Sequence, residues 1–233
     1  MMSRWNAMIV GSLLLTGLGR PLAAQLPEHK AIKWVRDSRE YVELTRQIYA
    51  QATAAVRTAA AREPGPWAVV MDLDETVLDN SVYQLQIAAY GTAFDTASWN
   101  AWVRRAEAGV VPGAAEFIAA VHEAGGRMAY VSGREQSTTE ETRRNLAALG
   151  LIRDGDLLCL RDAAGAYSKR MRRAELRAGK GRCAWDTPVP VVAYIGDATG
   201  DFPDPDEEPG TFGVEFFMLA NPMYGSWEGA VTR

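Results

Sequence analysis

The chain has 233 residues, of which 48% are apolar and 23% are charged, so it is long enough to bury one hydrophobic core with a small accessory layer. Its formal net charge of −4 and isoelectric point near 5.4 lack the basic surplus of proteins that bind polymeric nucleic acid or anionic membranes. These values argue against a nucleic-acid polymer as a partner, but they leave single nucleotides open as ligands.

The first 24 residues differ in composition from the rest of the chain. Arg4 precedes an apolar stretch, and Ala24 closes the segment. An apolar stretch of ~15 residues is short for a bilayer span of ~20, and with a small residue at its end it is typical of a secretory signal peptide. We therefore expect residues 1–24 to be removed and the mature protein, residues 25–233, to be periplasmic or secreted. The alternative is an uncleaved amino-terminal anchor.

Residues 30–62 carry apolar side chains at mixed three- and four-residue steps, the pattern of an amphipathic helix. The segment ends before Pro64-Gly65-Pro66 and directly precedes an apolar run that begins at Ala68. We therefore predict an amino-terminal helical layer that belongs to the same domain as the strand after it.

Residues 80–111 follow the first apolar run without an obvious strand pattern. They contain five aromatic residues: Tyr83, Tyr90, Phe94, Trp99 and Trp102. An insertion at this place would overhang the end of the first strand as a small helical cap. Its aromatic residues either pack the cap itself or offer a stacking surface for the ring of a ligand.

The rest of the chain alternates between strand and helix patterns. Including the first, short apolar runs predict five buried strands, at residues 68–71, 127–131, 157–160, 191–195 and 216–219. Helices are predicted between them at residues 114–124, 137–150 and 168–178, the second opened by a capping box at residues 137–140 and the third by Ser168. This alternation implies right-handed crossovers and an α/β fold with a doubly wound parallel sheet.

Cys159 and Cys183 are the two cysteines of the sequence, and an oxidising compartment permits them to pair. Cys159 lies in the apolar run 157–160, which favours a buried thiol, and spacing alone does not decide between a bridge and two free thiols. No CxxC motif or histidine cluster indicates zinc. His29 and His122 are isolated, and we expect both at the surface.

Four aspartates follow two of the predicted strands. Asp72 and Asp74 come directly after residues 68–71, and Asp197 and Asp201 after residues 191–195. Carboxylates that meet at the carboxyl edge of a parallel sheet repel one another unless a hard divalent cation neutralises them, and oxygen ligands suit Mg²⁺. The strand period of two places Asp72 and Asp74 on one side, where one can attack while the other exchanges a proton with a leaving group.

Two further residues add to this chemistry. Ser132 follows the predicted strand 127–131, where a hydroxyl and backbone N–H groups can hold a phosphoryl oxygen. Lys169 begins a predicted helix and can place an ammonium group beside the nucleophile and the phosphoryl group. Taken singly, an Asp-x-Asp-x-Thr turn, a loop serine and a solvated lysine are ordinary structural features. Together and in this order they favour phosphoryl transfer.

In this order the residues resemble the haloacid dehalogenase (HAD) superfamily of phosphotransferases and, within it, the class C acid phosphatases. The resemblance extends over residues 34–49, 68–81, 99–103, 111–113, 196–202 and 221–228. It implies a HAD-like fold with a small helical cap and a Mg²⁺-dependent phosphomonoesterase that works through an aspartyl-phosphate intermediate. It also implies nucleoside monophosphates as the favoured substrates.

The resemblance implies a role for each matching residue. Asp72 is the implied nucleophile and a metal ligand, and Asp74 is the implied general acid and base, which also offers its backbone carbonyl to Mg²⁺. Asp197 is the implied second carboxylate ligand, and Asp201 supports the metal shell. The implied substrate contacts are to the phosphate from Ser132 and Lys169, and to the organic part from Trp99 and Tyr224.

Two residues depart from the family's pattern. Gln25 stands where many class C enzymes carry a lipid-modified cysteine, so we expect no stable membrane anchor. Gly133 replaces the Asn that often follows the motif hydroxyl.

The main alternative function is a noncatalytic periplasmic or surface protein that binds haem or a nucleotide on the same scaffold, and a phosphonatase or dehalogenase is a further one. A homodimer is compatible with the sequence.

Overall fold

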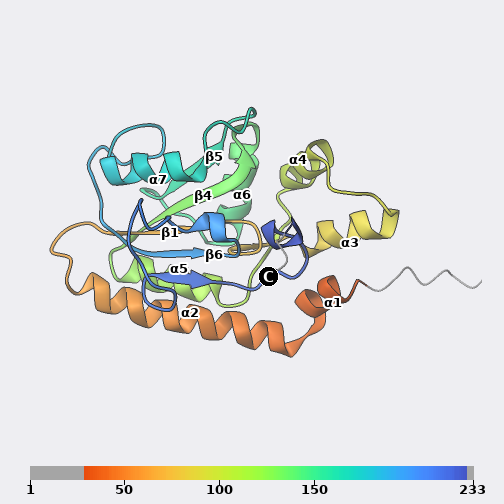
Figure 1. Cartoon of the computed structure of the whole chain (residues 1–233), viewed down its shortest axis with the longest axis horizontal. Helices are drawn as coiled ribbons and strands as arrows, with labels where there is room; N and C mark the ends of the chain where they lie inside the picture. The colour runs from red at the N-terminus through yellow and green to blue at the C-terminus, as the bar shows by residue number, and fades with distance from the viewer. Residues whose placement is uncertain (1–28, 230–233) are drawn as a thin grey trace, which may run out of the picture.

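The computed structural model describes residues 29–229. Its centre is a parallel sheet with the strand order β5-β4-β1-β6-β7 (Figure 1). The strands are β1 (Ala68–Met71), β4 (Arg127–Glu135), β5 (Leu157–Arg161), β6 (Val191–Gly196) and β7 (Phe216–Met218). All five predicted strands are present, and the predicted doubly wound α/β fold is confirmed.

The sheet is buried on both faces. Successive residues of a strand point to opposite sides, so Val69 and Met71 join a hydrophobic core on one face while Ala68 and Val70 join a second core on the other. A strand that is covered on both sides is apolar almost throughout. This is why the strands could be predicted from uninterrupted apolar runs.

Helices supply the two outer layers (Figure 1). One face of the sheet is covered by α2 (Arg39–Ala60), α5 (Ala114–Glu123) and α6 (Thr139–Ala148). Val56, Phe117 and Leu146 bring these helices into the larger core. On the opposite face, α7 (Lys169–Ala178) contributes Leu176 to the second core.

The predicted amino-terminal helical layer is present and consists of two helices. α1 (Lys30–Asp37) is separated from α2 by Ser38, which has an extended backbone. The Ser38 side chain accepts a hydrogen bond from the backbone N–H of Tyr41 at 3.0 Å. A serine that caps a helix in this way satisfies one of its free N–H groups and so starts a new helix.

Residues 81–105 form the cap, which projects beyond the carboxyl ends of the strands (Figure 1). It contains α3 (Ser81–Tyr90) and α4 (Thr96–Arg105), and Asp95 caps α4 by accepting from two backbone N–H groups. At its base, β2 (Leu78–Asp79) pairs antiparallel with β3 (Gly109–Val110). The sequence did not predict this pair because two residues are too few to show a strand period.

β4 continues four residues beyond its predicted end, to Glu135. Ser132 therefore lies within the strand and not after it. A short helix, η1 (Gln136–Thr138), then leads into α6, whose N-cap residue Thr138 makes no side-chain capping bond. The predicted capping box at residues 137–140 is wrong, because the Ser137 hydroxyl lies 3.4 Å from the Glu135 carboxylate instead.

Cys159 and Cys183 form a disulfide, which settles the question that their spacing left open. The bridge joins β5 to residues 179–190, a segment with no helix or strand between α7 and β6. Cys183, Trp185 and Val189 of this segment are buried in the second core, and the Trp185 indole donates to the carbonyl of Gly155 at 2.7 Å. The disulfide therefore fixes on the core a segment that lacks repeating backbone hydrogen bonds.

Candidate active site

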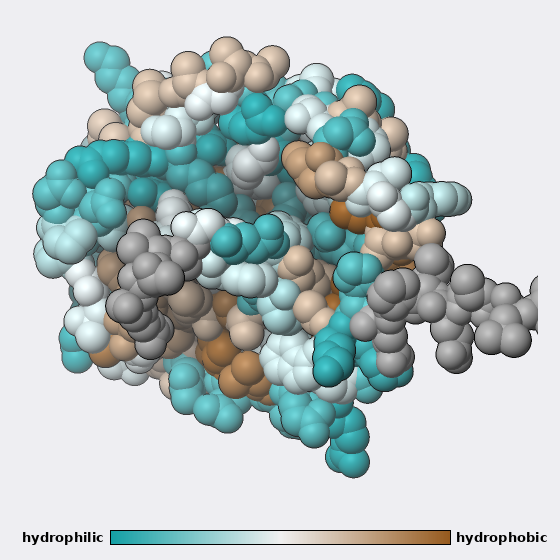
Figure 2. Space-filling view, turned by 45° about the vertical axis from the view of Figure 1, so that its right-hand side comes forward, coloured by the Kyte–Doolittle hydropathy of each residue, from teal (hydrophilic) through white to brown (hydrophobic). Residues whose placement is uncertain are grey.

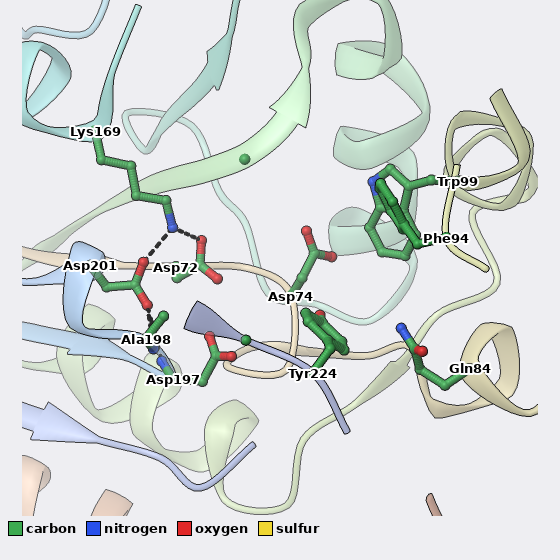
Figure 3. A pocket seen from close by; sticks show the side chains of 12 residues that line it. Asp72, Asp74, Gln84, Phe94, Trp99, Lys169, Asp197, Ala198, Asp201 and Tyr224 are labelled. Carbon is green, nitrogen blue, oxygen red and sulfur yellow. Dashed lines mark hydrogen bonds and ion pairs between the residues drawn. The ribbon is translucent and has the colours of Figure 1, made fainter. Parts of the chain in front are cut away.

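The two aspartates after β1 lie at the carboxyl edge of the sheet. The backbone N–H of Asp72 still donates to Ile195 of β6 at 3.0 Å, and the chain then turns, with Val77 donating back to the carbonyl of Leu73 at 2.8 Å. Asp72 precedes this turn and Asp74 lies within it, and both residues line one cavity (Figure 3).

Lys169 lies between two of the carboxylates. It is the first residue of α7, whose N-cap Ser168 accepts a hydrogen bond from Met171 as predicted. Its Nζ lies 2.5 Å from Asp72 Oδ1 and also contacts the carboxylate of Asp201 (Figure 3). Burial alone would lower the pKa of Lys169, but the two paired carboxylates raise it above its ordinary value. The ammonium group therefore remains charged at this edge of the sheet.

Asp197 and Asp201 follow β6. Asp201 ends the short helix η2 (Thr199–Asp201), and its Oδ2 accepts hydrogen bonds from the backbone N–H groups of Asp197 at 3.1 Å and Ala198 at 2.9 Å. The Asp197 carboxylate accepts from the side-chain amide of Asn221 at 2.9 Å. These bonds fix both carboxylates in position next to Asp72.

Three carboxylates converge closely enough to share a cation. One oxygen from each of Asp72, Asp197 and Asp201 lies within 4.8 Å of the other two. Burial raises the pKa of Asp72 well above its ordinary value, and burial together with the charge of Asp201 raises the pKa of Asp197 to about 6. A divalent cation would offset this cost of ionisation, and a donor set made only of oxygen suits a hard cation. The residues present therefore fit a divalent metal.

Asp74 is held by a residue that the sequence analysis did not single out. Arg134 Nε and Nη2 donate to Asp74 Oδ1 at 2.9 and 2.7 Å, and the Asn80 amide donates to the same oxygen at 3.0 Å. The Ser132 hydroxyl lies 3.4 Å from Asp74 Oδ2 and accepts from the backbone N–H of Arg134 at 3.1 Å. Ser132 is fully buried. Its contact with Asp74 puts the hydroxyl at the edge of the site.

A cavity of about 390 Å³ opens between the carboxylates and the cap. Lys169 and the aspartates form its polar end, and Gly133 also borders it. The aromatic residues Trp99 and Tyr224, both implied as substrate contacts, line it together with Phe94, one of the predicted cap aromatics, and Gln84, which the sequence did not indicate (Figure 3). Figure 2, with the cap side turned forward, shows this side of the molecule hollowed, with hydrophobic residues beside the hollow. The cavity thus combines a charged end with an aromatic rim.

Two of the missed residues differ in whether the sequence contained a signal for them. Alternate residues of a strand lie on the same side, so Ser132 and Arg134 share one side of β4, as Asp72 and Asp74 share one side after β1. A prediction that extended this strand to residue 134 would therefore have indicated Arg134. Asn221 lies in the stretch 221–228 that resembles the family, but no local pattern indicated its contact with Asp197, which joins segments 24 residues apart in the chain.

The two histidines have different surroundings. His29 is exposed, as expected. His122 is half-buried, and its Nε2 lies 3.0 Å from the carboxylate of Asp156. Asp156 also accepts from the backbone N–H of Met128 at 2.9 Å, so the pair connects α5 to β4. The expectation of a surface position is wrong for His122. The sequence around His122 does not show its partner, because Asp156 lies 34 residues away in the chain.

The acidic loop after Asp201 is paired with α7. The Glu207 carboxylate, 2% exposed, accepts from Arg173 Nε and Nη2, both at 2.9 Å, and from Arg177 Nη1 at 3.0 Å. These ion pairs lower the pKa of Glu207 although burial alone would raise it. The loop therefore attaches the Asp201 region to the helix that carries Lys169.

A doubly wound parallel sheet with this set of acidic and basic side chains at its carboxyl edge defines a class of enzymes that act on phosphate esters. The family model described as HAD superfamily, subfamily IIIB (Acid phosphatase) matches residues 21–227. The chain belongs to this family.

Solved structures agree with the family model. Two structures of the class C acid phosphatase from Bacillus anthracis, one of them with tungstate bound, match this chain with TM-scores of 0.72 and 0.71. Each is 27% identical, and each match covers 86% of both chains. The predicted resemblance is confirmed: the protein is an acid phosphatase that hydrolyses phosphomonoesters, and the alternative of a noncatalytic binding protein is not favoured.

Proposed function

We propose that this acid phosphatase uses Mg²⁺ and an aspartyl-phosphate on Asp72 to hydrolyse nucleoside monophosphates. The observation that carries the proposal is the convergence of Asp72, Asp197, Asp201 and Lys169 at the polar end of a cavity with an aromatic rim. A charged end suits a phosphate group, and an aromatic rim suits the flat ring of a base.

Asp72 is the proposed nucleophile. Its carboxylate oxygen bonds to phosphorus while the bond from phosphorus to the ester oxygen breaks, which gives an acyl phosphate on Asp72 and an alcohol. The Lys169 ammonium, 2.5 Å from Asp72 Oδ1, favours the ionised nucleophile and then balances the charge of the transferred group. Ser132 is the proposed second contact to the phosphate.

Asp74 is the proposed general acid and base. In the first step it gives a proton to the departing ester oxygen, so that a neutral alcohol leaves. In the second step its carboxylate takes a proton from water, which attacks phosphorus and releases inorganic phosphate and free Asp72. Both residues line the same cavity, which supports the proposal that they act on the same substrate.

Mg²⁺ is proposed to be held by the carboxylates of Asp72 and Asp197 and by the backbone carbonyl of Asp74, with Asp201 supporting the shell. The carboxylate of Asp74 is already bonded to Arg134. Coordination of Mg²⁺ through the backbone carbonyl of Asp74 therefore leaves this carboxylate available as the general acid. When bound, the ion would screen the repulsion between the phosphate and the surrounding carboxylates.

Removal of divalent metal tests the first part of this proposal. We expect EDTA to reduce hydrolysis of p-nitrophenyl phosphate to background, because the buried carboxylates would then repel the phosphate, and excess Mg²⁺ to restore it. The measurement is the initial rate before and after chelation, with circular dichroism as the control for folding. A chelated enzyme that is folded, metal-free by elemental analysis and fully active would contradict the proposal.

The substrate preference is tested through the aromatic rim. Trp99→Ala removes a ring that lines the cavity, and stacking of a base on an aromatic side chain is worth about 1–3 kcal/mol. We expect the KM for a nucleoside 5′-monophosphate to rise about tenfold and the KM for glycerol phosphate, which has no ring, to stay within about twofold. Equal changes for both substrates would show that the rim does not select a base.

The compartment and the division of the chain are proposed from the sequence. We propose a periplasmic or secreted enzyme with residues 1–24 as signal peptide, residues 25–233 as one phosphatase domain and residues 80–111 as its cap insertion. The predicted signal peptide lies outside the described residues. Across residues 29–229, no helix is both long and apolar enough to cross a bilayer. The absence of a lipid anchor and the formation of a homodimer both stay predictions.

A further inference from the structure

Arg134 is buried between β4 and the base of the cap, with 1% of its surface exposed. Its guanidinium group donates to Asp74 from both Nε and Nη2, to Asn80 at 3.3 Å and to Thr142 at 3.4 Å. A buried guanidinium is costly unless its charge is paired. Its pairing with Asp74 therefore anchors it in one position.

The hydrogen bonds to Asp74 are unequally divided between its two carboxylate oxygens. Oδ1 accepts from two guanidinium nitrogens and from the Asn80 amide, whereas Oδ2 has one long contact of 3.4 Å with the Ser132 hydroxyl. A proton on Oδ1 would face three N–H donors, none of which can accept it. The proton of a neutral Asp74 therefore resides on Oδ2.

We infer that Arg134 is a positioning residue for the general acid, which fixes the plane of the Asp74 carboxyl group and directs the transferable proton to Oδ2. The inference rests on the proposed function, in which Asp74 protonates the leaving group. The planar fork of arginine holds a carboxylate in a defined orientation, which the ammonium group of lysine does not.

The same group of residues connects Asp74 to the cap. The Arg134 guanidinium lies 5.7 Å from the centre of the Trp99 ring, and Asn80 accepts a hydrogen bond from the Trp102 indole at 2.9 Å. Both tryptophans belong to α4. The orientation of the acid therefore depends on the position of the cap helix that also lines the substrate cavity.

Arg134→Lys tests the inference through the leaving group. p-Nitrophenolate is stable as an anion and departs without a proton, whereas the alkoxide of benzyl phosphate, a substrate of similar size, needs one. We expect kcat/KM for benzyl phosphate to fall about tenfold or more and kcat/KM for p-nitrophenyl phosphate to fall less than about threefold. kcat/KM reports only the steps up to aspartyl-phosphate formation, and the ratio of the two values does not depend on the fraction of folded enzyme.

Two variants separate the inference from the proposed function. Asp74→Asn must show a larger selective loss on benzyl phosphate, and equal losses on both substrates would refute the role of Asp74 as acid. If Asp74→Asn is selective but Arg134→Lys lowers both substrates equally, the inference about Arg134 is wrong. Thr142→Val removes a guanidinium contact that involves neither Asp74 nor Asn80 and is expected to leave the ratio unchanged.

A second variant covers the case in which Arg134→Lys does not fold. Asn80→Ser removes one of the three donors to Asp74 Oδ1 and the 3.3 Å contact of Asn80 with the guanidinium, and it leaves both donors of Arg134 to Asp74 present. We expect a selective loss on benzyl phosphate that is smaller than the loss in Asp74→Asn. An unchanged ratio, or an equal loss on both substrates, would overturn the inference.

Discussion

Asp72→Asn is expected to abolish phosphatase activity while the protein stays folded. The asparagine has nearly the same shape but no charge, so the bond from position 72 to phosphorus cannot form. Removal of a covalent nucleophile in other hydrolases costs several orders of magnitude in kcat, and we expect a loss of about 10⁴-fold or more. The measurement is kcat on p-nitrophenyl phosphate at saturating substrate.

The controls for this prediction follow from the surroundings of Asp72. Lys169 keeps its ion pair with Asp201 in the variant, and one charge leaves a crowded cluster of carboxylates, so we expect the melting temperature to be similar or higher. Rapid quenching of wild-type enzyme with labelled substrate should trap phosphate on a peptide that contains residue 72. A folded Asp72→Asn enzyme with more than a few per cent of wild-type kcat would rule out the nucleophile.

Loss of the disulfide is expected to have the largest effect on stability. Cys159 and Cys183 are 24 residues apart, and closing a loop of this length restricts the unfolded chain by about 3 kcal/mol. For a chain of this size, 1 kcal/mol corresponds to about 2–4 °C, so the double Cys→Ser variant should melt roughly 6–12 °C lower. The measurement is thermal unfolding by circular dichroism under non-reducing conditions.

The disulfide prediction has its own control. The wild-type protein under reducing conditions should melt at about the same temperature as the double variant, and reducing agent should not shift the variant further. Both effects would arise from the same bridge. If reduction leaves the melting temperature of the wild type unchanged although labelling shows two free thiols, the bridge contributes no stability.

The secondary structure was predictable where a local pattern carries the information. β1 has the predicted bounds because its run of residues is buried on both faces. Predictions of helix starts were less reliable: Ser168 caps α7 as expected, whereas the capping box predicted at Ser137 is absent. A serine caps a helix only when its side chain accepts a hydrogen bond from the first turn, and serine also occurs inside helices and in turns. The residue type alone therefore does not identify a cap.

The sequence by itself determined the fold class and the aspartates at the ends of β1 and β6, because burial of a strand and the residues that follow it are local properties of the chain. The tertiary structure alone decided the partners: the pairing of Asp74 with Arg134 and the bridge between Cys159 and Cys183. These contacts join residues 60 and 24 positions apart. Such a contact depends on how strands and helices pack in space. No periodic pattern in the sequence indicates which residues, far apart in the chain, will meet.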